Sequence, residues 1–494
     1  MINDRFNGSA FAVFVLFFAL VTVMGFVASR WRKPETLAHL DEWGLGGRQF
    51  GTWITWFLVG GDFYTAYTVI AVPALVYATG AYGFFALPYT IIVYPIVFFI
   101  MPRLWAVAAR EGHVTAADVV HARYGSRALE LAVAITGVIA TMPYIALQLI
   151  GMEVVIKAVG LNGELPLITA FLILAFYTYS AGLRAPALIA FVKDIMIYVV
   201  VLAAVAVIPL KLGGYSAVFA AADAAFKAKG SGGVLLAPAQ YMPYATLALG
   251  SAMAAFMYPH TLTGIFASSS GETIRKNAIL LPAYTLLLGL IALLGYMAYA
   301  AGIKPNTPND VVPLLFQTLF PAWFSGFAFA AIAIGALVPA AVMSIGASNL
   351  FTRNFWKAYV NPAVTPEGEA KVAKVTSLFV KVGALLVILF LPTQFALDLQ
   401  LLGGLWILQT FPSVVFGLFT RWFRAPGLLA GWAVGFFGGS FIAWGDGLKP
   451  LHAVSFGGAT YTIYVGLLAL AANVIVAVLV NLVPAGRSAP AVAR

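Results

Sequence analysis

The stretch WITWFLVGGDFYTAYTVIAVP, residues 53–73, places Gly60-Gly61-Asp62 inside an otherwise apolar run. A second stretch, LALGSAMAAFMYPHTLTGIFA at residues 247–267, holds Tyr258-Pro259-His260 in a similar setting. Glycine loosens a helix, and proline deletes an intrahelical hydrogen bond and crowds the preceding turn. In hydrocarbon, a helix breaks at membrane depth only where the freed backbone lines a cavity. Each stretch predicts a discontinuous membrane helix beside a cavity; a packing glycine pair and a tolerated kink are the alternative readings.

The composition around these stretches is that of a membrane protein. Hydrophobic residues make up 62% of the 494 residues, charged residues only 9%, and the mean hydropathy is +0.95. A soluble domain usually carries about a quarter charged residues. The apolar runs are long and continuous, whereas barrel strands would alternate in polarity. The absence of cysteine excludes disulfides and thiolate metal sites.

Thirteen apolar runs approach the roughly 20 residues that a membrane-spanning helix needs. The sequence therefore predicts an all-α, polytopic membrane protein in which residues 1–494 form a single transmembrane domain. The predicted spans are 10–29, 51–79, 82–107, 128–156, 165–181, 186–210, 240–268, 277–302, 323–352, 373–391, 394–420, 426–445 and 457–484.

Loop charges predict the orientation. With the N-terminus outside and the C-terminus inside, the inside loops carry 19 of the 28 lysines and arginines and the outside segments seven. This distribution follows the positive-inside rule of bacterial inner membranes. It also accounts for the net charge of +10 without a nucleic-acid partner.

The spacing of the two broken spans adds to their meaning. They are the second and the seventh, so each opens a unit of five helices, and an odd-numbered repeat inserts with opposite topology. We expect a first inverted repeat at 51–210 and a second at 240–420. One extra helix at 10–29 precedes them, and two extra helices at 426–484 follow. Such repeats bind their solute at the midplane, between the two discontinuous helices.

Several motifs carry a family resemblance: Gly46-Gly47-Arg48, Gly182-Leu183-Arg184-Ala185 ahead of Asp194, Tyr258-Pro259-His260 and Ala341-Val342-Met343-Ser344. As a set they resemble the sodium:solute symporter family, which implies a LeuT-type 5+5 fold. The segments 43–48, 60–67 and 143–148 resemble the bacterial monocarboxylate permeases in particular. That resemblance implies a cation-coupled symporter for lactate, pyruvate, short-chain acids and, in some members, alanine. A sodium symporter of another small solute, such as proline or pantothenate, is the alternative.

Ionisable groups deep in a span are costly, so their default interpretation is functional. Asp62 is predicted to be a cation partner or proton carrier beside the substrate, and a helix cap is its alternative role. Asp194 lies beside Lys193, but neighbours on a helix point about 100° apart and need not pair. The resemblance places Asp194 near a sodium exit route, and a structural ion pair is the alternative. His260 is predicted to face the substrate, and a core histidine with satisfied hydrogen bonds is the alternative.

The remaining candidates complete the predicted site. Gln148 offers an amide to a carboxylate, or else binds a neighbouring backbone. Around the two breaks, the predicted substrate-binding residues also include Gly61, Tyr64, Tyr67, Tyr258 and Thr261. A half-helix N-terminus attracts an anion, which supplies a carboxylate cradle without arginine.

The resemblance also implies a sodium site. Carried over, its ligands fall on Gly60, Phe63, Ala341 and Ser344, and then on Ile345. Isoleucine offers no oxygen to a hard cation, so the site is weakened or retired. The coupling ion is therefore Na⁺ or H⁺, with no other cofactor. Two further function classes are disfavoured: a channel would need a polar ring, and a zinc protease would need His-Glu-x-x-His, which is absent. We expect a protein that functions as a monomer.

Overall fold

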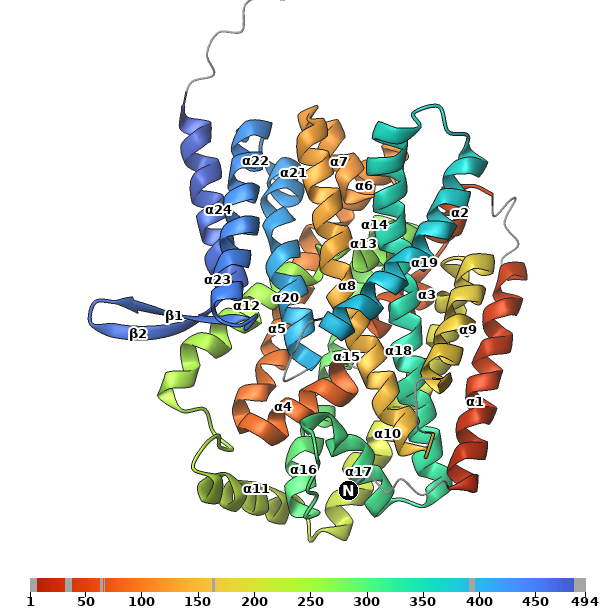
Figure 1. Ribbon diagram of the computed structural model, residues 1–494, viewed down its shortest axis with the longest axis vertical. Helices are drawn as coiled ribbons and strands as arrows, with labels where there is room; N and C mark the ends of the chain where they lie inside the picture. Colours follow the sequence, from red (N-terminus) through yellow and green to blue (C-terminus); the bar gives the residue numbers. More distant parts are fainter. Residues whose placement is uncertain are drawn as a thin grey trace, which may run out of the picture.

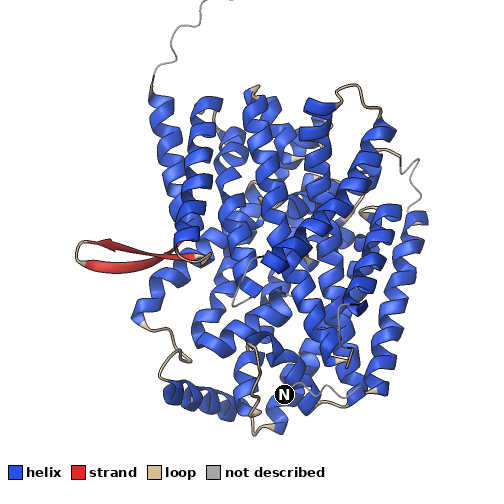
Figure 2. Ribbon diagram, viewed as in Figure 1, coloured by secondary structure: helices blue, strands red, loops and turns tan. Residues whose placement is uncertain are grey.

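The computed structural model describes residues 7–31, 38–62, 65, 67–161, 165–390 and 396–483. Long helices run side by side along the vertical axis of Figure 1, with α8 and α18 near the centre of the bundle. The N-terminal α1 and the C-terminal α24 lie at opposite edges of the same view. Figure 2 shows how completely helix dominates the architecture.

The first half of the chain supplies eleven helices. In chain order they are α1 (Gly8–Val27), α2 (Leu40–Leu45), α3 (Thr52–Thr55), α4 (Val72–Thr79), α5 (Ala86–Phe99), α6 (Met101–Glu111), α7 (Ala116–Tyr124), α8 (Arg127–Ala158), α9 (Leu165–Ala181), α10 (Arg184–Lys211) and α11 (Tyr215–Lys229).

The second half supplies the remaining helices and two strands. They are α12 (Tyr241–Ala255), α13 (Pro259–Ala267), α14 (Gly271–Leu280), α15 (Pro282–Ala292), α16 (Leu294–Ala300), α17 (Val311–Leu319), α18 (Ala322–Phe351), α19 (Pro366–Phe390), α20 (Ala396–Ile407), α21 (Gly417–Phe419), α22 (Ala425–Ala433), α23 (Gly439–Gly445), β1 (Leu451–Phe456), β2 (Ala459–Tyr464) and α24 (Val465–Leu482).

Nine helical segments within the described residues are long and apolar enough to cross a membrane. They are Gly8–Arg30, Thr68–Phe99, Arg127–Ala158, Arg184–Lys211, Gly271–Ala300, Ala322–Val360, Leu397–Phe419, Ala425–Gly445 and Val465–Leu482. The apolar α9 is shorter, and α12 and α13 divide the predicted span 240–268 into two short pieces. The polytopic helical fold is therefore shown, whereas the count of thirteen spans stays a prediction.

Two boundaries differ from the sequence-based expectation. The predicted span 82–107 is divided at Ile100 into α5 and α6, because Pro102 favours a new helix start and α6 carries charged residues on one face. The predicted span 457–484 begins too early, since residues 459–464 form β2 and the helix α24 begins at Val465.

The antiparallel hairpin β1–β2 also corrects the all-α expectation, and it projects sideways from the bundle in Figure 1. Alternating Thr, Tyr and Ile in β2 favour a strand. Gly457 and Gly458 form the turn with φ of +60° and +81°, the left-handed values that a two-residue type I′ turn requires. The sequence analysis read these residues as an apolar run and missed their period of two.

Candidate functional site

The first predicted break lies just after Gly61, where the regular helical hydrogen bonding ends. A π-helical turn, Trp56–Gly60, follows α3, and the Asp62 amide still donates to the Leu58 carbonyl at 3.2 Å. Thr65 is then a bend, and the Thr68 hydroxyl caps it by accepting from the Thr65 amide at 3.1 Å. Helix resumes at Tyr67 and continues into α4. The predicted ligands Phe63 and Tyr64 lie outside the described residues.

Glycine at this break permits close packing that no other residue would allow. A Cβ added at Gly60 would lie 2.2 Å from Cε2 of Tyr284, on α15. A Cβ added at Gly61 would lie 2.9 Å from both the Lys193 Nζ and the Asp194 Oδ2, on α10. The break is therefore pressed directly against two other helices.

Lys193 and Asp194 form an ion pair against this backbone. The Lys193 Nζ lies 2.9 Å from the Asp194 Oδ1 and donates to the Gly61 carbonyl at 2.6 Å. The Tyr284 hydroxyl donates to the Asp194 Oδ2 at 2.7 Å. Both members of the pair have side chains that are 0% exposed. Of the two roles considered for Asp194, the ion pair is the one that the geometry displays; the sequence left Lys193 and Tyr284 out of the site.

Asp62 lies next to this pair and is 5% exposed. Neither carboxylate oxygen has a hydrogen-bond partner among the residues that the structure describes. An ionised carboxylate in such a place is unstable without a cation or a proton. The buried position of Asp62 is thus compatible with the predicted coupling role.

The second predicted break separates α12 from α13. α12 ends at Ala255, Tyr258 has an extended backbone with ψ of 137°, and α13 starts at Pro259. Proline suits this first helical position because its missing N–H would have no intrahelical partner there. His260 is 2% exposed and Thr261 is 4% exposed, in the first turn of α13. Their backbone amides lie at the positive end of that half-helix.

Three rings connect this break to α8. The Tyr144 ring lies 5.3 Å from both the Tyr258 ring and the His260 ring, and the latter two are 5.2 Å apart. The Tyr144 hydroxyl is hydrogen-bonded to Thr65 and lies close enough to Asp62 to feel its charge. Tyr144 therefore bridges the two breaks. It precedes Gln148 by one helical turn, the spacing that would have added it to the predicted site.

Other predicted substrate residues surround this bridge. Gln148 is buried on α8, and its Nε2 donates to the Tyr144 carbonyl at 3.4 Å, the backbone contact considered as its alternative role. The Tyr258 hydroxyl donates to the Gln400 carbonyl at 3.0 Å. The backbone of Tyr67 is helical, while its side chain lies outside the described structure.

The predicted sodium ligands of the ninth span lie on α18, deep in the bundle. Ala341, Ser344 and Ile345 are all 0% exposed. The Ser344 hydroxyl donates to the Ala341 carbonyl at 2.8 Å. α18 also packs tightly on the second break, because a Cβ added at Gly346 would lie 2.7 Å from the Pro259 carbonyl carbon. Among the described residues, no group of His, Asp or Glu is arranged to hold a metal ion.

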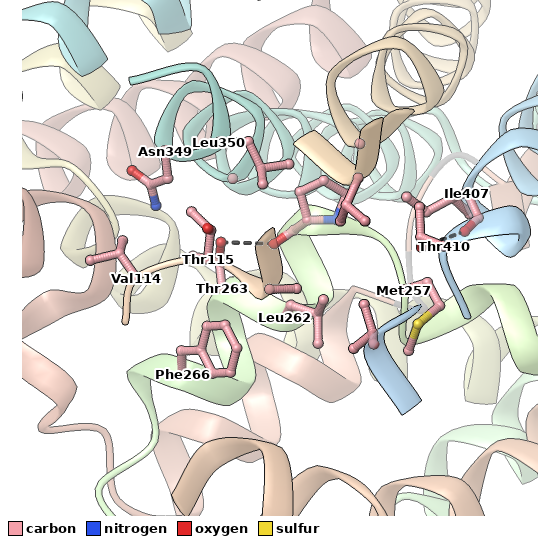
Figure 3. Close-up of a pocket in the computed structure, with 16 residues that line it drawn as sticks. Val114, Thr115, Met257, Leu262, Thr263, Phe266, Asn349, Leu350, Ile407 and Thr410 are labelled. Carbon is pink, nitrogen blue, oxygen red and sulfur yellow. Dashed lines mark hydrogen bonds between the residues drawn. The ribbon is translucent and has the colours of Figure 1, made fainter. Parts of the chain in front are cut away.

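A narrow pocket lies beside α13, lined in part by Pro259, Leu262 and Thr263 of that helix. Figure 3 shows Thr115, Thr263 and Asn349 around one part of it and Met257 with Thr410 around another. The centre of a water-sized sphere can occupy about 20 Å³ inside this pocket. That space holds one or two water molecules. A molecule larger than water fits here only if the lining helices move apart.

The glycine-rich motifs meet at the same end of the bundle. Gly182, with φ of +57°, lies so close to α2 that a Cβ would be 2.1 Å from the Trp43 carbonyl oxygen. The Arg184 guanidinium donates to the Glu42 carbonyl at 2.7 Å and to its carboxylate at 2.6 Å. Arg48 donates to the Phe266 carbonyl at 3.3 Å, which ties this end to α13.

Outside the spans, a small charged cluster follows α6. The Arg110 guanidinium donates to the Glu111 carboxylate at 2.7 Å, and the His113 imidazole lies 3.0 Å from its other oxygen. These two hydrogen bonds hold the pKa of Glu111 below its ordinary value. The cluster lies away from the two breaks and is not part of the candidate site.

The match to a known protein family covers the motifs described for the two breaks and α18. The model of the sodium:solute symporter family matches residues 43–435, which include both breaks and α18. The chain belongs to the sodium:solute symporter family. Its members named below are symporters and permeases, which confirms a transporter and not an enzyme.

Relatives of this family member extend over nearly its whole length. A monocarboxylate transport permease protein of Rhizobium johnstonii is 78% identical over 97% of this chain and 98% of its own. The uncharacterized symporter YodF of Bacillus subtilis is 34% identical over 96% of this chain and 93% of its own. A solved Na⁺-coupled sialic acid symporter matches 98% of this chain and 100% of its own with a TM-score of 0.79. At 16% identity, that last likeness shows the fold.

Proposed function

We propose that this family member is a cation-coupled symporter that imports small monocarboxylates, such as lactate, pyruvate and short-chain acids, by alternating access. Alanine is a further candidate substrate. The name of the 78% identical Rhizobium relative supports the solute class. The observation that carries the mechanism is the meeting of two helix breaks at one buried place, where Tyr144 lies between His260 and Thr65.

This place suits a small anion. The first-turn amides of α13 offer the positive end of a half-helix, an interaction worth up to about 2 kcal/mol in a partly buried geometry. Tyr144 and His260 add polar groups beside it, with aromatic faces that fit a short apolar tail. We assign the carboxylate to the α13 amides and the tail to the ring cluster, with Gly61, Tyr64, Tyr67, Gln148, Tyr258 and Thr261 completing the cavity.

Asp62 then makes a cation obligatory. Two like charges about 4 Å apart repel by about 4 kcal/mol at an effective dielectric of about 20. A cation at Asp62 removes this repulsion, so anion and cation each strengthen the binding of the other. The family and the Na⁺-coupled sialic acid symporter favour sodium, held by Gly60, Phe63, Ala341 and Ser344. A proton on Asp62 or Asp194 is the alternative, and Ile345 favours it.

The wider arrangement follows from the sequence pattern. We propose that the units 51–210 and 240–420 are inverted repeats that move relative to one another around the site, with the helix at 10–29 and the pair at 426–484 outside this core. The protein lies in a bacterial inner membrane with its N-terminus outside and its C-terminus inside. It works as a monomer.

Uptake by proteoliposomes tests the proposal. Purified protein is reconstituted, and uptake of labelled lactate and pyruvate is measured with sodium and proton gradients imposed separately. Competition by unlabelled proline and pantothenate examines the alternative solutes. We expect saturable uptake that monocarboxylates inhibit, and Asp62→Asn to abolish its dependence on the cation gradient. Asp446→Asn is the control, because Asp446 pairs with His452 at 2.7 Å far from the breaks. Gradient-dependent uptake by Asp62→Asn would refute the coupling role.

A further inference from the structure

A lysine is already bound at the first helix break. Its ammonium donates to the Gly61 carbonyl at 2.6 Å, directly beside the predicted sodium ligand Gly60. The Lys193 side chain is 0% exposed, and α10 delivers it from one side of the break. A buried lysine is costly in a membrane and is retained where it has a specific role.

The ammonium does the two things that a bound cation does at a broken helix. It takes a backbone carbonyl that the break has freed, and it balances a buried carboxylate, Asp194, at 2.9 Å. The Tyr284 hydroxyl fixes the other oxygen of that carboxylate at 2.7 Å. Lys193 therefore contacts the break and Asp194 directly, and Tyr284 positions Asp194.

The residues expected to bind sodium are less suited to it. Ile345 contributes hydrocarbon where an oxygen ligand would be needed. The Ser344 hydroxyl donates to the Ala341 carbonyl at 2.8 Å, so that carbonyl already accepts a hydrogen bond, whereas the Ser344 oxygen keeps its lone pairs. The Lys193 ammonium on the Gly61 carbonyl, next to the predicted ligand Gly60, would also repel an entering sodium ion.

We propose that Lys193 is a tethered cation that takes the place of sodium at the first helix break, and that the coupling ion is a proton carried by Asp62. This inference rests on the proposed function, monocarboxylate symport, and specifies its ion. The Asp62 carboxylate takes up one proton on the outside as the substrate anion binds. It releases that proton on the inside when the anion leaves.

The charges around Lys193 support a proton at Asp62 in particular. The titratable groups that face the cluster are Asp194 and Tyr198 on α10, Tyr284 on α15, Tyr144 on α8, and Asp62 at the break. Two other long helices, α1 and α18, pack on α10, and neither contains a charged residue. Lys193 and Asp194 neutralise each other, which leaves Asp62 as the carboxylate without a partner among the described residues. One proton and one anion entering together keep the net charge unchanged, so transport is electroneutral.

The first experiment uses the wild-type protein in proteoliposomes. Uptake of labelled lactate is measured with external sodium replaced by potassium or choline, with an inward proton gradient, and with a potential set by valinomycin. Protein-free liposomes correct for diffusion of the undissociated acid. We expect no loss of uptake without sodium, an increase of about tenfold with the proton gradient, and no response to the potential. A requirement for sodium, or uptake driven by the potential, would overturn the inference.

The second experiment examines the lysine. Lys193→Met should reduce proton-driven uptake at least about tenfold, whereas Lys381→Met should not. Lys381 is a matched control: it is also 0% exposed, but it lies on α19 and donates to the Ser377 carbonyl in its own helix at 3.2 Å. The paired substitution Lys193→Ala with Ile345→Ser should create binding of ²²Na⁺ that the wild type lacks. Saturable ²²Na⁺ binding by the wild type would contradict the tethered cation even if the variants fail to fold.

Counterflow separates this inference from the proposed function. Labelled lactate exchanging with unlabelled lactate inside the vesicles needs no ion gradient. Counterflow together with sodium-dependent uptake would refute the tethered cation and leave the proposed function standing. Absence of counterflow with every monocarboxylate would refute the proposed function, and the ²²Na⁺ measurement then decides on Lys193 by itself.

Discussion

Replacing Gly60 by alanine should disrupt the first helix break through one specific contact. The added methyl carbon would lie 2.2 Å from Cε2 of Tyr284 and 2.8 Å from two further ring atoms. Real side chains do not approach so closely, so either the ring or the break must move. The ring cannot move freely, because it packs against Trp56 at 4.8 Å and its hydroxyl holds Asp194 at 2.7 Å.

The magnitude follows from these two contacts. Overpacking a filled site costs about 1–3 kcal/mol. Displacing the ring also loses a hydrogen bond to a charged group, worth about 1.5–3 kcal/mol. We expect Gly60→Ala to destabilise the folded protein by about 2.5–6 kcal/mol and to reduce uptake at least about tenfold, because the misplaced Asp194 no longer fixes Lys193.

Thermal unfolding of the purified protein, followed by tryptophan fluorescence, measures the first effect, and lactate uptake measures the second. Gly438→Ala is the matched control. Gly438 is also helical, and a Cβ there would meet nothing within 4 Å, so alanine should be neutral or stabilise by up to about 1 kcal/mol. If Gly60→Ala unfolds and transports like Gly438→Ala, the close contact between the break and α15 is not a feature of the protein.

Three further substitutions probe other contacts. Arg184→Lys should lose about 1.5–3 kcal/mol of stability, measured by thermal unfolding, because lysine lacks the planar fork whose two nitrogens bind the Glu42 carbonyl and carboxylate; an unchanged transition would contradict this. The buried Asn354 amide donates to the carboxylates of Asp118 and Glu130 at 2.7 and 2.8 Å. Asn354→Asp should destabilise the protein by about 3–5 kcal/mol in the same assay, because a third carboxylate would be repelled by these two. Asn354→Ala should destabilise it less. Cysteines at Val59 and Gly264 should cross-link on oxidation, because a Cβ at Gly264 would lie 2.9 Å from the Val59 Cγ2, and the chain has no other cysteine. Uptake should survive this cross-link, and its loss on oxidation with recovery on reduction would show that the two segments separate during transport.

The sequence predicted best what local chemistry decides. Pro259 cannot continue a helix and the Gly60-Gly61 pair weakens one, so both breaks could be located from a few neighbouring residues. The family resemblance, carried by short motifs, located α18 and its Ala341 and Ser344. Burial of Asp62 and His260 followed from their place inside apolar runs.

What the sequence could not provide was contact between distant elements. Lys193 reaches the Gly61 carbonyl across 132 positions of the chain, and Tyr284 comes from another helix again. Periodicity places each residue on a helix face but does not specify the partner of that face. The hairpin β1–β2 was missed for a different reason, since an apolar count over residues 457–464 does not register alternation.

The glycine contacts also bear on which parts move together. Gly60 packs on Tyr284 of α15, and Gly264 of α13 packs on Val59, so the first broken helix is fastened to two helices of the second predicted repeat. Two closely packed segments tend to move together, because sliding one past the other would create atomic overlaps and empty space, and both cost free energy. We therefore expect the two breaks to move as one unit, so that the boundary between the moving parts would run through both predicted repeats; this refines the proposed movement of whole repeats. α13 is packed as closely on α18, where a Cβ at Gly346 would lie 2.7 Å from the Pro259 carbonyl carbon, so the proposed change of access must open that contact, beside the narrow pocket at Thr263 and Asn349.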